Sequence, residues 1–482
     1  MDLPDGVLKL VLQHVLVKDR LGSCCLVSRR MHAAAVAATE TLSFQGPPQH
    51  AASASVWLSS CGQQLTKLYF GVWGPPRELV CPNLLELELF GCHVQLGAAD
   101  GHAGITQSCT KLTRLVLYGQ VTDMPQGGIV DCGLSRLVHL QYLDLVPTNY
   151  GATRCVGLSV SVLPCLQHLT FLQVIHLSIE NVAQLVGLTN LQELHLSAGQ
   201  EGIFSEEPAV GLSSVPGLVL PASLTKLVLS SPVEAGILSA APAGLQDLQV
   251  GCTVEGPPAG PDSFLSCMAR LQSLTRLSIE PVSLALPPPG PAYSALTASS
   301  SLVQLDLSDI ELPTGVWSYV FPASCKLLHL TSLLFGAWHD NIDDAIVSHP
   351  RWSAANLVSL VSRCPSLRCA ENLFLQPGLH VSELHKLTAL TRVGLYYSSD
   401  SEDSCSEFIK GLAVISQLHS LDMETQRPQF FQVPMASLLP LTSLTTLTHF
   451  QSSWGTMNPT VSLHTTGGYL PQVSTQFRAL LW

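Results

Sequence analysis

The side chains best suited to chemistry in this 482-residue chain are its 17 histidines and 15 cysteines. Both residue types bind transition metals or act in catalysis, but only when their partners stand at fixed spacing. The histidines recur at no ligand spacing, and no two cysteines form a Cys-x-x-Cys pair. The sequence also lacks a His-Glu-x-x-His motif, a Gly-x-Ser-x-Gly motif and a phosphate-binding Gly-Lys-Ser/Thr loop. We therefore expect a non-catalytic protein without a metal or cofactor, whose cysteines are small core residues.

The charge of the chain limits its partners. Charged residues make up 12% of the sequence, and 35 acidic against 23 basic residues give a net charge of −12. Nucleic-acid binding needs clustered Lys and Arg, so we expect no nucleic-acid partner. We also expect no membrane partner, because no apolar run reaches about eighteen residues. The first residues lack the basic and apolar segments of a secretory signal, so we expect a cytoplasmic or nuclear protein with reduced cysteines.

The pattern Leu-x-x-Leu-x-Leu recurs along most of the chain, so a repeated structural element positions the side chains. Several copies lie 28 residues apart, for example those beginning at Leu84, Leu112 and Leu140. This spacing and period are typical of leucine-rich repeats. The other clear copies begin at Leu191, Leu224, Leu274, Leu302, Leu330, Leu390 and Leu418, and the weaker ones at Leu65, Leu172, Leu245, Leu367 and Leu444. We predict an α/β fold, a solenoid with short parallel strands on its concave side and helical or irregular segments on its convex side.

Position within the repeat predicts which side chains are free to bind. The first leucine lies on the turn into the strand and the next two point inward, so the third, fifth and seventh positions face outward on the concave side. The candidates for binding a target protein at these positions are Tyr69, Glu88, Phe90, Tyr118, Tyr142, Asp144 and His195. Phe90, Tyr118 and Tyr142 stand in neighbouring repeats and could form an aromatic anchor. The alternative is that they are unrelated exposed aromatic residues, which are common on protein surfaces.

The first forty residues differ from the repeats. Their apolar residues follow helical spacing at Leu8, Val11, Leu12, Val15 and Leu16. Asp19 and Ser28 fit the N-caps of a second and a third short helix. Three such helices cannot bury a sufficient core alone, so they must pack on the rest of the chain or on another protein.

This N-terminal stretch resembles an F-box. The resemblance rests on the residues Leu3-Pro4-Asp5, Leu8, Leu12, Leu16, Asp19, Leu21 and Leu26-Val27-Ser28-Arg29-Arg30. Met31 departs from the family's usual Trp, and Val17-Lys18 from its common Asp-Pro. The segment from Cys81 to Cys92 is similar to the cysteine-containing repeat of F-box proteins. The resemblance implies docking onto a Skp-type adaptor of a cullin–RING ubiquitin ligase through Leu3, Pro4, Leu8, Leu12, Leu26 and Val27.

The expected organisation has four parts. Residues 1–40 form the F-box-like helices, 41–64 a capping strand and loop, 65–450 about 14 repeats, and 451–482 a C-terminal cap. The ninth repeat position mostly lacks the Asn or Cys that satisfies loop backbone groups, so backbone or water contacts must replace it. The acidic run at 398–407 is either a phosphorylation segment or a capping box from Ser404 to Glu407.

Two functions fit these features. In the first, the chain is the substrate-recognition subunit of a Skp–cullin–F-box ligase, and its repeats bind a target protein for ubiquitination. In the second, it is an interaction scaffold or sensor whose N-terminal helices only cap the repeats. A small-molecule site on the repeats is a further option, although the concave positions show no Arg/Lys cluster for a polyphosphate.

Overall fold

The computed structural model divides the chain into two compact units, Met1–Thr225 and Lys226–Trp482. It describes residues 4–15, 19, 27–45, 58, 62–71, 79–94, 104–121, 129–130, 133–146, 157–158, 162–174, 184–196, 219–230, 233–251, 254–255, 263–279, 290–308, 312–335, 351–375, 381–397, 408–425, 440–441 and 443–453. The acidic run, the C-terminal cap from 454 onward, Leu3 and Leu26 lie outside these residues.

In the N-terminal unit, short parallel strands follow one another in chain order along one sheet. Their order is β1-β2-β3-β4-β6-β8-β9. Their bounds are β1 Thr41–Gln45, β2 Lys67–Gly71, β3 Glu86–Val94, β4 Arg114–Val121, β6 Tyr142–Val146, β8 Phe171–Val174 and β9 Glu193–Leu196. A separate two-stranded sheet pairs β5 Ile129–Val130 with β7 Gly157–Leu158. Between the strands lie α6 Ile105–Ser108 and the 3₁₀ turns η3 Gly62–Gln64, η4 Leu134–Arg136, η5 Leu163–Cys165 and η6 Leu185–Gly187.

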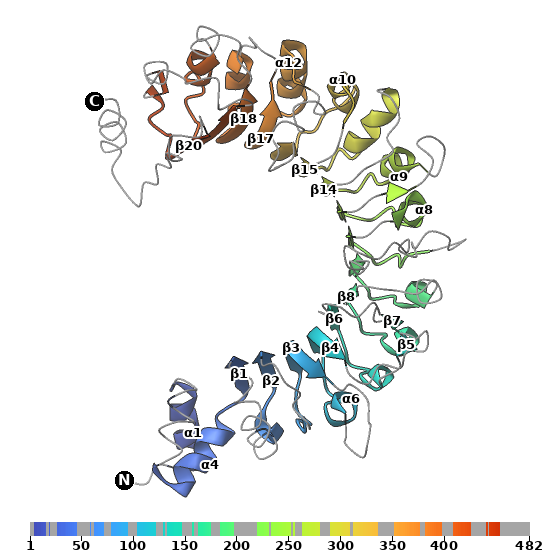
Figure 1. The fold of residues 1–482 in the computed structure, drawn as a ribbon, viewed down its shortest axis with the longest axis vertical. Helices are drawn as coiled ribbons and strands as arrows, with labels where there is room; N and C mark the ends of the chain where they lie inside the picture. Colours follow the sequence, from blue (N-terminus) through green and yellow to red (C-terminus); the bar gives the residue numbers. More distant parts are fainter. Residues whose placement is uncertain are drawn as a thin grey trace. The chain divides into compact units, whose positions relative to one another are not determined.

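The C-terminal unit repeats this plan with longer connecting helices. Its strands are β10 Lys226–Leu229, β12 Asp247–Val250, β14 Arg276–Ile279, β15 Gln304–Leu307, β16 Ser332–Phe335, β17 Cys369–Phe374, β18 Arg392–Tyr397, β19 Ser420–Thr425 and β20 His449–Ser453. They are parallel and lie in that order, while β11 Val233–Glu234 pairs with β13 Val254–Glu255. Its helical segments are α8 Ala235–Ser239, α9 Phe264–Arg270, η7 Pro291–Thr297, α10 Trp317–Val320, α12 Ala354–Arg363 and η8 Val381–Lys386. Within each unit the strands line one side and the helical segments the other (Figure 1).

The core confirms the leucine-rich repeat prediction. In the repeat that contains β3, Leu84 lies on the turn before the strand, and Leu87 and Leu89 point inward, each at most 1% exposed. The side chains between them alternate outward, and β2, β8, β9, β10, β12, β15 and β16 show the same alternation of partly exposed and buried positions. Each repeat therefore buries its leucines only against its neighbours, so the fold is a stack of leucine-rich repeats.

One repeat was predicted in the wrong register. The leucine pattern predicts the first position of that repeat at Leu172, but Leu172 occupies the fourth position, inside β8. The repeat runs from Leu169 through Leu172 to Val174, all buried. Its sixth position carries valine instead of leucine, so the leucine pattern is broken there. In the observed register, Phe171 takes the outward third position.

In every other repeat, a threonine hydroxyl at the start of the strand forms a hydrogen bond to the preceding repeat. We call these hydrogen bonds the threonine ladder. At the second repeat position, every other repeat carries a threonine whose hydroxyl donates to a backbone carbonyl of the preceding repeat at 3.0 to 3.2 Å. The pairs are Thr66 with Glu40, Thr113 with Leu85, Thr170 with Gln141, Thr225 with Gln192, Thr275 with Gln246, Thr331 with Val303, Thr391 with Arg368 and Thr448 with His419. The leucine pattern does not predict these hydrogen bonds, which use the second repeat position instead of the ninth.

Two of the three predicted N-terminal helices lie within the described residues. They are α1 Asp5–Gln13 and α4 Arg29–Ala37, and the Ser28 hydroxyl caps α4 by accepting from the Met31 N–H at 3.1 Å. The predicted middle helix falls almost wholly on residues that the structure leaves undescribed. Leu12 packs with Ala34, Ala35 and Ala38 in a small core that Leu8, Val15 and Met31 border. The three-helix arrangement of an F-box therefore remains a prediction.

Among the helices that the structure describes, none has the length and apolar character needed to span a bilayer. Seven of the described cysteines are free thiols, and four of these, Cys81, Cys109, Cys267 and Cys364, are buried, as expected of core residues. The expected domain boundaries at 40, 64 and 450 stay predictions.

Candidate functional site

The strand register of the N-terminal unit places a cluster of aromatic and charged side chains on the face opposite the helical segments, which we call the open face. It corresponds to the predicted concave side. Register pairs align Lys67, Glu86, Arg114, Tyr142, Phe171 and Glu193 in one row, and Tyr69, Glu88, Val116, Asp144, Gln173 and His195 in the next. Neighbouring parallel strands lie about 4.8 Å apart, so side chains along a row are in contact distance. We call these two rows, with Phe90 and Tyr118, the open-face cluster.

The aromatic residues of the cluster form two stacks. Phe90 and Tyr118 stack with their ring centroids 5.0 Å apart and an interplanar angle of 7°. Tyr142 stacks on Phe171 at 3.9 Å and 4°, and His195 lies tilted against Phe171 at 4.9 Å. The predicted anchor of Phe90, Tyr118 and Tyr142 is therefore divided between the two stacks. Phe171 was missed because its repeat was read in the wrong register.

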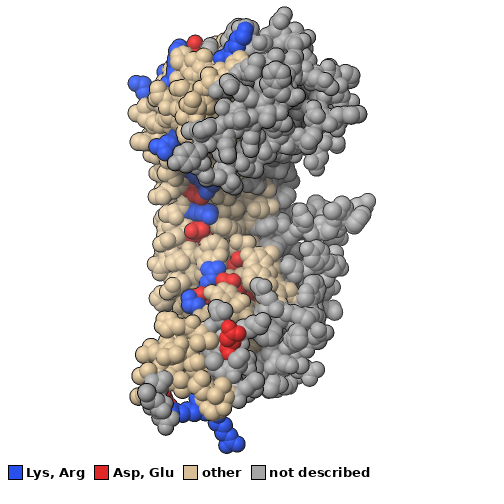
Figure 2. All heavy atoms as spheres, turned by 90° about the vertical axis from the view of Figure 1, so that its left-hand side faces the viewer, with Lys and Arg blue, Asp and Glu red and all other residues tan. Residues whose placement is uncertain are grey.

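Ion pairs tie the acidic residues of the cluster to neighbouring strands. The Lys67 ammonium lies 2.6 Å from Glu86, and the Arg114 Nε lies 3.0 Å from Glu88. The Tyr69 hydroxyl donates to Glu86 at 3.3 Å. The hydrogen bond from Lys67 to Glu86 raises the pKa of Lys67 above its ordinary value. Figure 2 shows the consequence on this side of the molecule, where acidic and basic side chains lie next to one another instead of in separate areas.

Arg114 connects the charged and aromatic parts. Its guanidinium lies over the Tyr142 ring, 3.7 Å from the centroid, while its Nε holds Glu88. A guanidinium over an aromatic face is attracted by the ring's electron density and stacks flat on it. The Tyr142 ring of this cluster therefore already carries an arginine over its face.

Asp144 is less accessible than predicted. It lies on the open-face side of β6, because Leu143 and Leu145 point into the core, yet it is only 3% exposed. The Tyr118 hydroxyl donates to its Oδ2 at 2.9 Å. Burial raises the pKa of the Asp144 carboxyl above its ordinary value, although the Tyr118 hydrogen bond and the Arg114 charge act in the other direction. Asp144 thus forms the floor of the cluster and not part of its exposed surface.

Among the other predicted target-binding residues, the structure places Tyr69, Glu88, Tyr118, Tyr142 and His195 partly exposed on the open face. Phe90 is 43% exposed. Burial is the largest cause that raises the pKa of Tyr118, to about 12, so its phenol stays a neutral donor toward Asp144. The predicted residues are thus brought together, and Arg114, Glu86 and Phe171 complete the cluster.

The predicted adaptor-binding residues are placed differently from one another. Leu12 is buried and Leu8 half-buried, because both pack toward α4. Pro4 is exposed as the N-cap of α1, and Val27 is 71% exposed just before α4. The outward side of α1 instead carries Val7, Leu10 and Val11, which are 42%, 60% and 51% exposed.

The remaining candidates for chemistry do not form a site within the described residues. These residues hold no group of three His, Cys, Asp or Glu side chains that could bind a metal. Burial raises the pKa of the Cys81 and Cys364 thiols to about 12 and that of Cys109 to about 11, so these thiols stay protonated and are poor nucleophiles.

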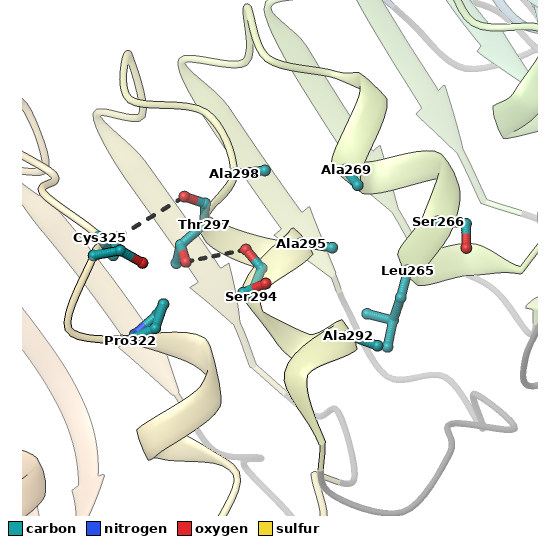
Figure 3. Close-up of a pocket in the computed structure, with 11 residues that line it drawn as sticks. Leu265, Ser266, Ala269, Ala292, Ser294, Ala295, Thr297, Ala298, Pro322 and Cys325 are labelled. Atoms are coloured by element: carbon teal, nitrogen blue, oxygen red, sulfur yellow. Dashed lines mark hydrogen bonds between the residues drawn. The ribbon is translucent and has the colours of Figure 1, made fainter.

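A hollow of about 410 Å³ lies on the helical side of the C-terminal unit (Figure 3). Small side chains of α9, η7 and the turn at 322–325 line it, and no charged residue is among them. Its Thr297 hydroxyl and Cys325 thiol are hydrogen-bonded to backbone carbonyls. The lining therefore holds no charged side chain that could bind an ion, and these two groups are already hydrogen-bonded.

Comparisons with known proteins do not assign the chain to a family. No family model matches the chain, and no curated protein matches it in sequence. Among solved structures, an internalin from Listeria monocytogenes is 18% identical, with a TM-score of 0.45 over 75% of this chain and 85% of that one. A TDR receptor is 15% identical, with a TM-score of 0.45 over 92% and 72%. The mouse RP105/MD-1 complex is 15% identical, with a TM-score of 0.38 over 82% and 76%.

Proposed function

We propose that the chain is a non-catalytic substrate receptor of a Skp–cullin–F-box ubiquitin ligase, whose open face binds a target protein. The observation that carries the binding part is the Tyr142–Phe171 stack, which lies between ion-paired charges on the open face. Aromatic residues surrounded by polar groups are the usual centres of protein–protein interfaces. The receptor adds proximity, since the ubiquitin-transfer chemistry belongs to other subunits. Such a receptor works in the cytoplasm or the nucleus.

The adaptor part of the proposal rests on the outward side of α1. Val7, Leu10 and Val11 follow the i, i+3, i+4 rule and form one exposed apolar stripe. Leu8 and Leu12 are already used in the contact with α4, so the stripe is left for an external partner. We therefore assign the main adaptor contact to Val7, Leu10 and Val11, with Pro4 and Val27 beside them, and give Leu8 and Leu12 a supporting role.

One observation favours the alternative scaffold function. Lys9 lies 3.4 Å from Glu40, and Gln13 donates to the same carboxylate at 3.3 Å, just before β1 begins. The helices thus contact the chain at the first strand, as a simple cap of the repeats would. Under this alternative the open face still binds a protein, but no ubiquitin ligase is recruited.

Co-purification with a Skp-type adaptor separates the two functions. The full chain is co-expressed with the adaptor as wild type, as the double variant Leu10→Glu/Val11→Glu, and as the control Val186→Glu. Val186 is 50% exposed on η6, so its substitution likewise places a glutamate at an exposed apolar position, but outside α1 and with one added charge instead of two. We expect wild type and Val186→Glu to retain the adaptor and the double variant to lose it. A wild-type chain that never retains the adaptor would leave the scaffold function.

A further inference from the structure

The floor of the open-face cluster holds a buried carboxylate oxygen that lacks a donor. Asp144 Oδ2 accepts from Tyr118, but Oδ1 is buried and accepts no hydrogen bond from the part of the chain that the structure describes. A buried acceptor without a donor destabilises a protein, and an ionised one does so more strongly. Native structures rarely retain such a group unless it serves a purpose, such as binding.

The surroundings of Asp144 favour a cation. The cluster contains the four carboxylates of Glu86, Glu88, Asp144 and Glu193 but only two permanent cations, Lys67 and Arg114. Both cations are already in contact with carboxylates, Lys67 with Glu86 and Arg114 with Glu88. The negative charge of Asp144 is therefore not balanced by an ion pair of its own, and the cluster attracts positive groups.

The aromatic rings narrow the choice of cation. Tyr118 lies on β4 and Tyr142 on β6, which also carries Asp144. Tyr118 stacks on Phe90, and Tyr142 stacks on Phe171. The guanidinium carbon of the chain's own Arg114 lies over the Tyr142 ring, 3.7 Å from its centroid. A planar guanidinium can stack on such a ring and donate to a carboxylate at the same time, which an ammonium cannot do as well.

We propose that the target is recognised through an arginine side chain that stacks against the Tyr118 and Tyr142 rings and donates to Asp144 Oδ1. This inference rests on the proposed binding function of the open face. Phe171 stacks on the Tyr142 ring and Arg114 lies over it. The target's arginine therefore takes the place of Arg114, whose half-buried side chain rotates aside while Tyr118 keeps its hydrogen bond to Oδ2. Asp144 then gains the donor it lacks, and the target's charge offsets the acidic excess of the cluster.

The test uses the full chain and a display library of random linear peptides. Peptides are selected on wild type and kept only if they fail to bind Tyr142→Ala, which confines them to the open face. Each retained peptide is then made with its arginine replaced by citrulline, a neutral analogue of the same shape, and by lysine. Affinities are measured for wild type, for Asp144→Asn and for Asp306→Asn. Asp306 is the control because it stands at the same strand position on β15 and its Oδ1 accepts from Ser308.

We expect the retained peptides to contain arginine and to lose about tenfold or more in affinity with citrulline, with a smaller loss for lysine. Asp144→Asn should cause a similar loss for arginine peptides and remove the difference between arginine and citrulline, while Asp306→Asn changes nothing. Retained peptides that bind equally well with citrulline overturn this inference but leave the open-face function. A selection that yields no peptide dependent on Tyr142 overturns both. The citrulline comparison needs only the wild-type chain, so it stands even if Asp144→Asn misfolds.

Discussion

The Thr331 hydroxyl donates a hydrogen bond of 3.2 Å to the carbonyl oxygen of Val303, 28 residues earlier in the chain. The same oxygen accepts the backbone N–H groups of Thr331 at 2.8 Å and of Ser332 at 3.2 Å. One carbonyl therefore joins two repeats through three donors. A repeat without threonine at this position lacks the hydroxyl contact. Each threonine-containing repeat is therefore bonded more firmly to the repeat before it than to the repeat after it.

Removing one rung of this ladder should lower stability. We expect Thr331→Val, which keeps the branched shape but loses the hydroxyl, to reduce the free energy of unfolding by about 0.5–1.5 kcal/mol. Urea unfolding followed by circular dichroism measures the change. Thr388→Val is the control, since Thr388 lies exposed on a turn of the same unit. Equal unfolding midpoints for the two variants would show that the ladder has no role in stability.

Target capture should depend on the Tyr142–Phe171 stack. The rings lie 3.9 Å apart, and Tyr142 also supports Arg114. We expect Tyr142→Ala/Phe171→Ala to weaken capture by about 2 kcal/mol or more, which is the usual loss at an interface centre. The triple variant of Phe90, Tyr118 and Tyr142 to Ala should abolish capture, but it also removes the Tyr118 donor to Asp144 and should therefore lower stability.

Proximity labelling in cells, followed by pull-down of the recovered proteins, measures this capture. Tyr319→Ala is the matched control, because Tyr319 is a half-buried tyrosine on α10 of the helical side. The prediction fails if the double variant recovers the same proteins as the control.

The buried thiols should make stability depend on pH in the alkaline range. Burial raises the pKa of Cys81 and Cys364 from 9.0 to about 12. Below pH 9 these thiols are protonated in both states, so their contribution to stability is fully present. As the pH rises above 9, the unfolded chain loses protons that the folded chain keeps, so the free energy of unfolding falls until the pH passes the folded pKa.

Urea midpoints at pH 8 and about pH 10 measure this decline. The double variant Cys81→Ala/Cys364→Ala should show a smaller decline than wild type. Alkylation gives a second readout, because iodoacetamide should modify these thiols only in unfolded protein. Rapid alkylation of both in the native state would contradict their placement in the core.

Trp352 should be a main source of stability in the C-terminal unit. Its side chain is fully buried, and its ring stacks on Trp317 at 4.5 Å and lies near Phe335 at 5.3 Å. We expect Trp352→Ala to lower the free energy of unfolding by about 3–5 kcal/mol. The buried Nε1–H finds no acceptor among the described residues, so Trp352→Phe removes an unsatisfied donor and should be much milder. Thermal unfolding of the two variants checks this order.

The regular part of this molecule could be predicted because leucine positions repeat. Leu84, Leu87 and Leu89 fix the turn, the strand and the outward positions between them, and each copy repeats the same geometry. The prediction failed at Val174, where a conservative substitution removed the leucine signal and shifted the expected register. Thr113 was overlooked for another reason. Its hydroxyl contacts the preceding repeat, and a pattern built on apolar residues does not report such a contact.

The candidate site could be predicted only as a set of positions. Alternation along the strands placed Tyr118, Tyr142 and Asp144 on one face, which is a local property of the sequence. It could not show that Tyr142 stacks on Phe171 instead of on Tyr118, because that depends on the rotamers of neighbouring strands. The burial of Asp144 depends on the same rotamers. Similarly, Leu8 and Leu12 were expected on an external surface, but the alanines of α4 leave room that these leucines fill.

The free chain should become more stable when Asp144 is neutralised, which is unusual for a residue on a binding face. Burial raises the pKa of this carboxyl above 3.8, so the folded state holds its proton more tightly than the unfolded state. The stability that this proton provides is fully present below pH 3.8 and is lost as the pH rises through the folded pKa. The ionised carboxylate, once buried, therefore works against folding. We expect Asp144→Asn to raise the free energy of unfolding at pH 7 by about 0.5–1.5 kcal/mol. The difference should disappear near pH 3, where wild type is protonated as well.

Urea unfolding at the two pH values measures both effects. Asp306→Asn is the control, because the Asp306 carboxylate already accepts a hydrogen bond from Ser308. A loss of stability in Asp144→Asn at pH 7 would show that the ionised carboxylate supports the fold, and Asp144 would then have no need of an external donor.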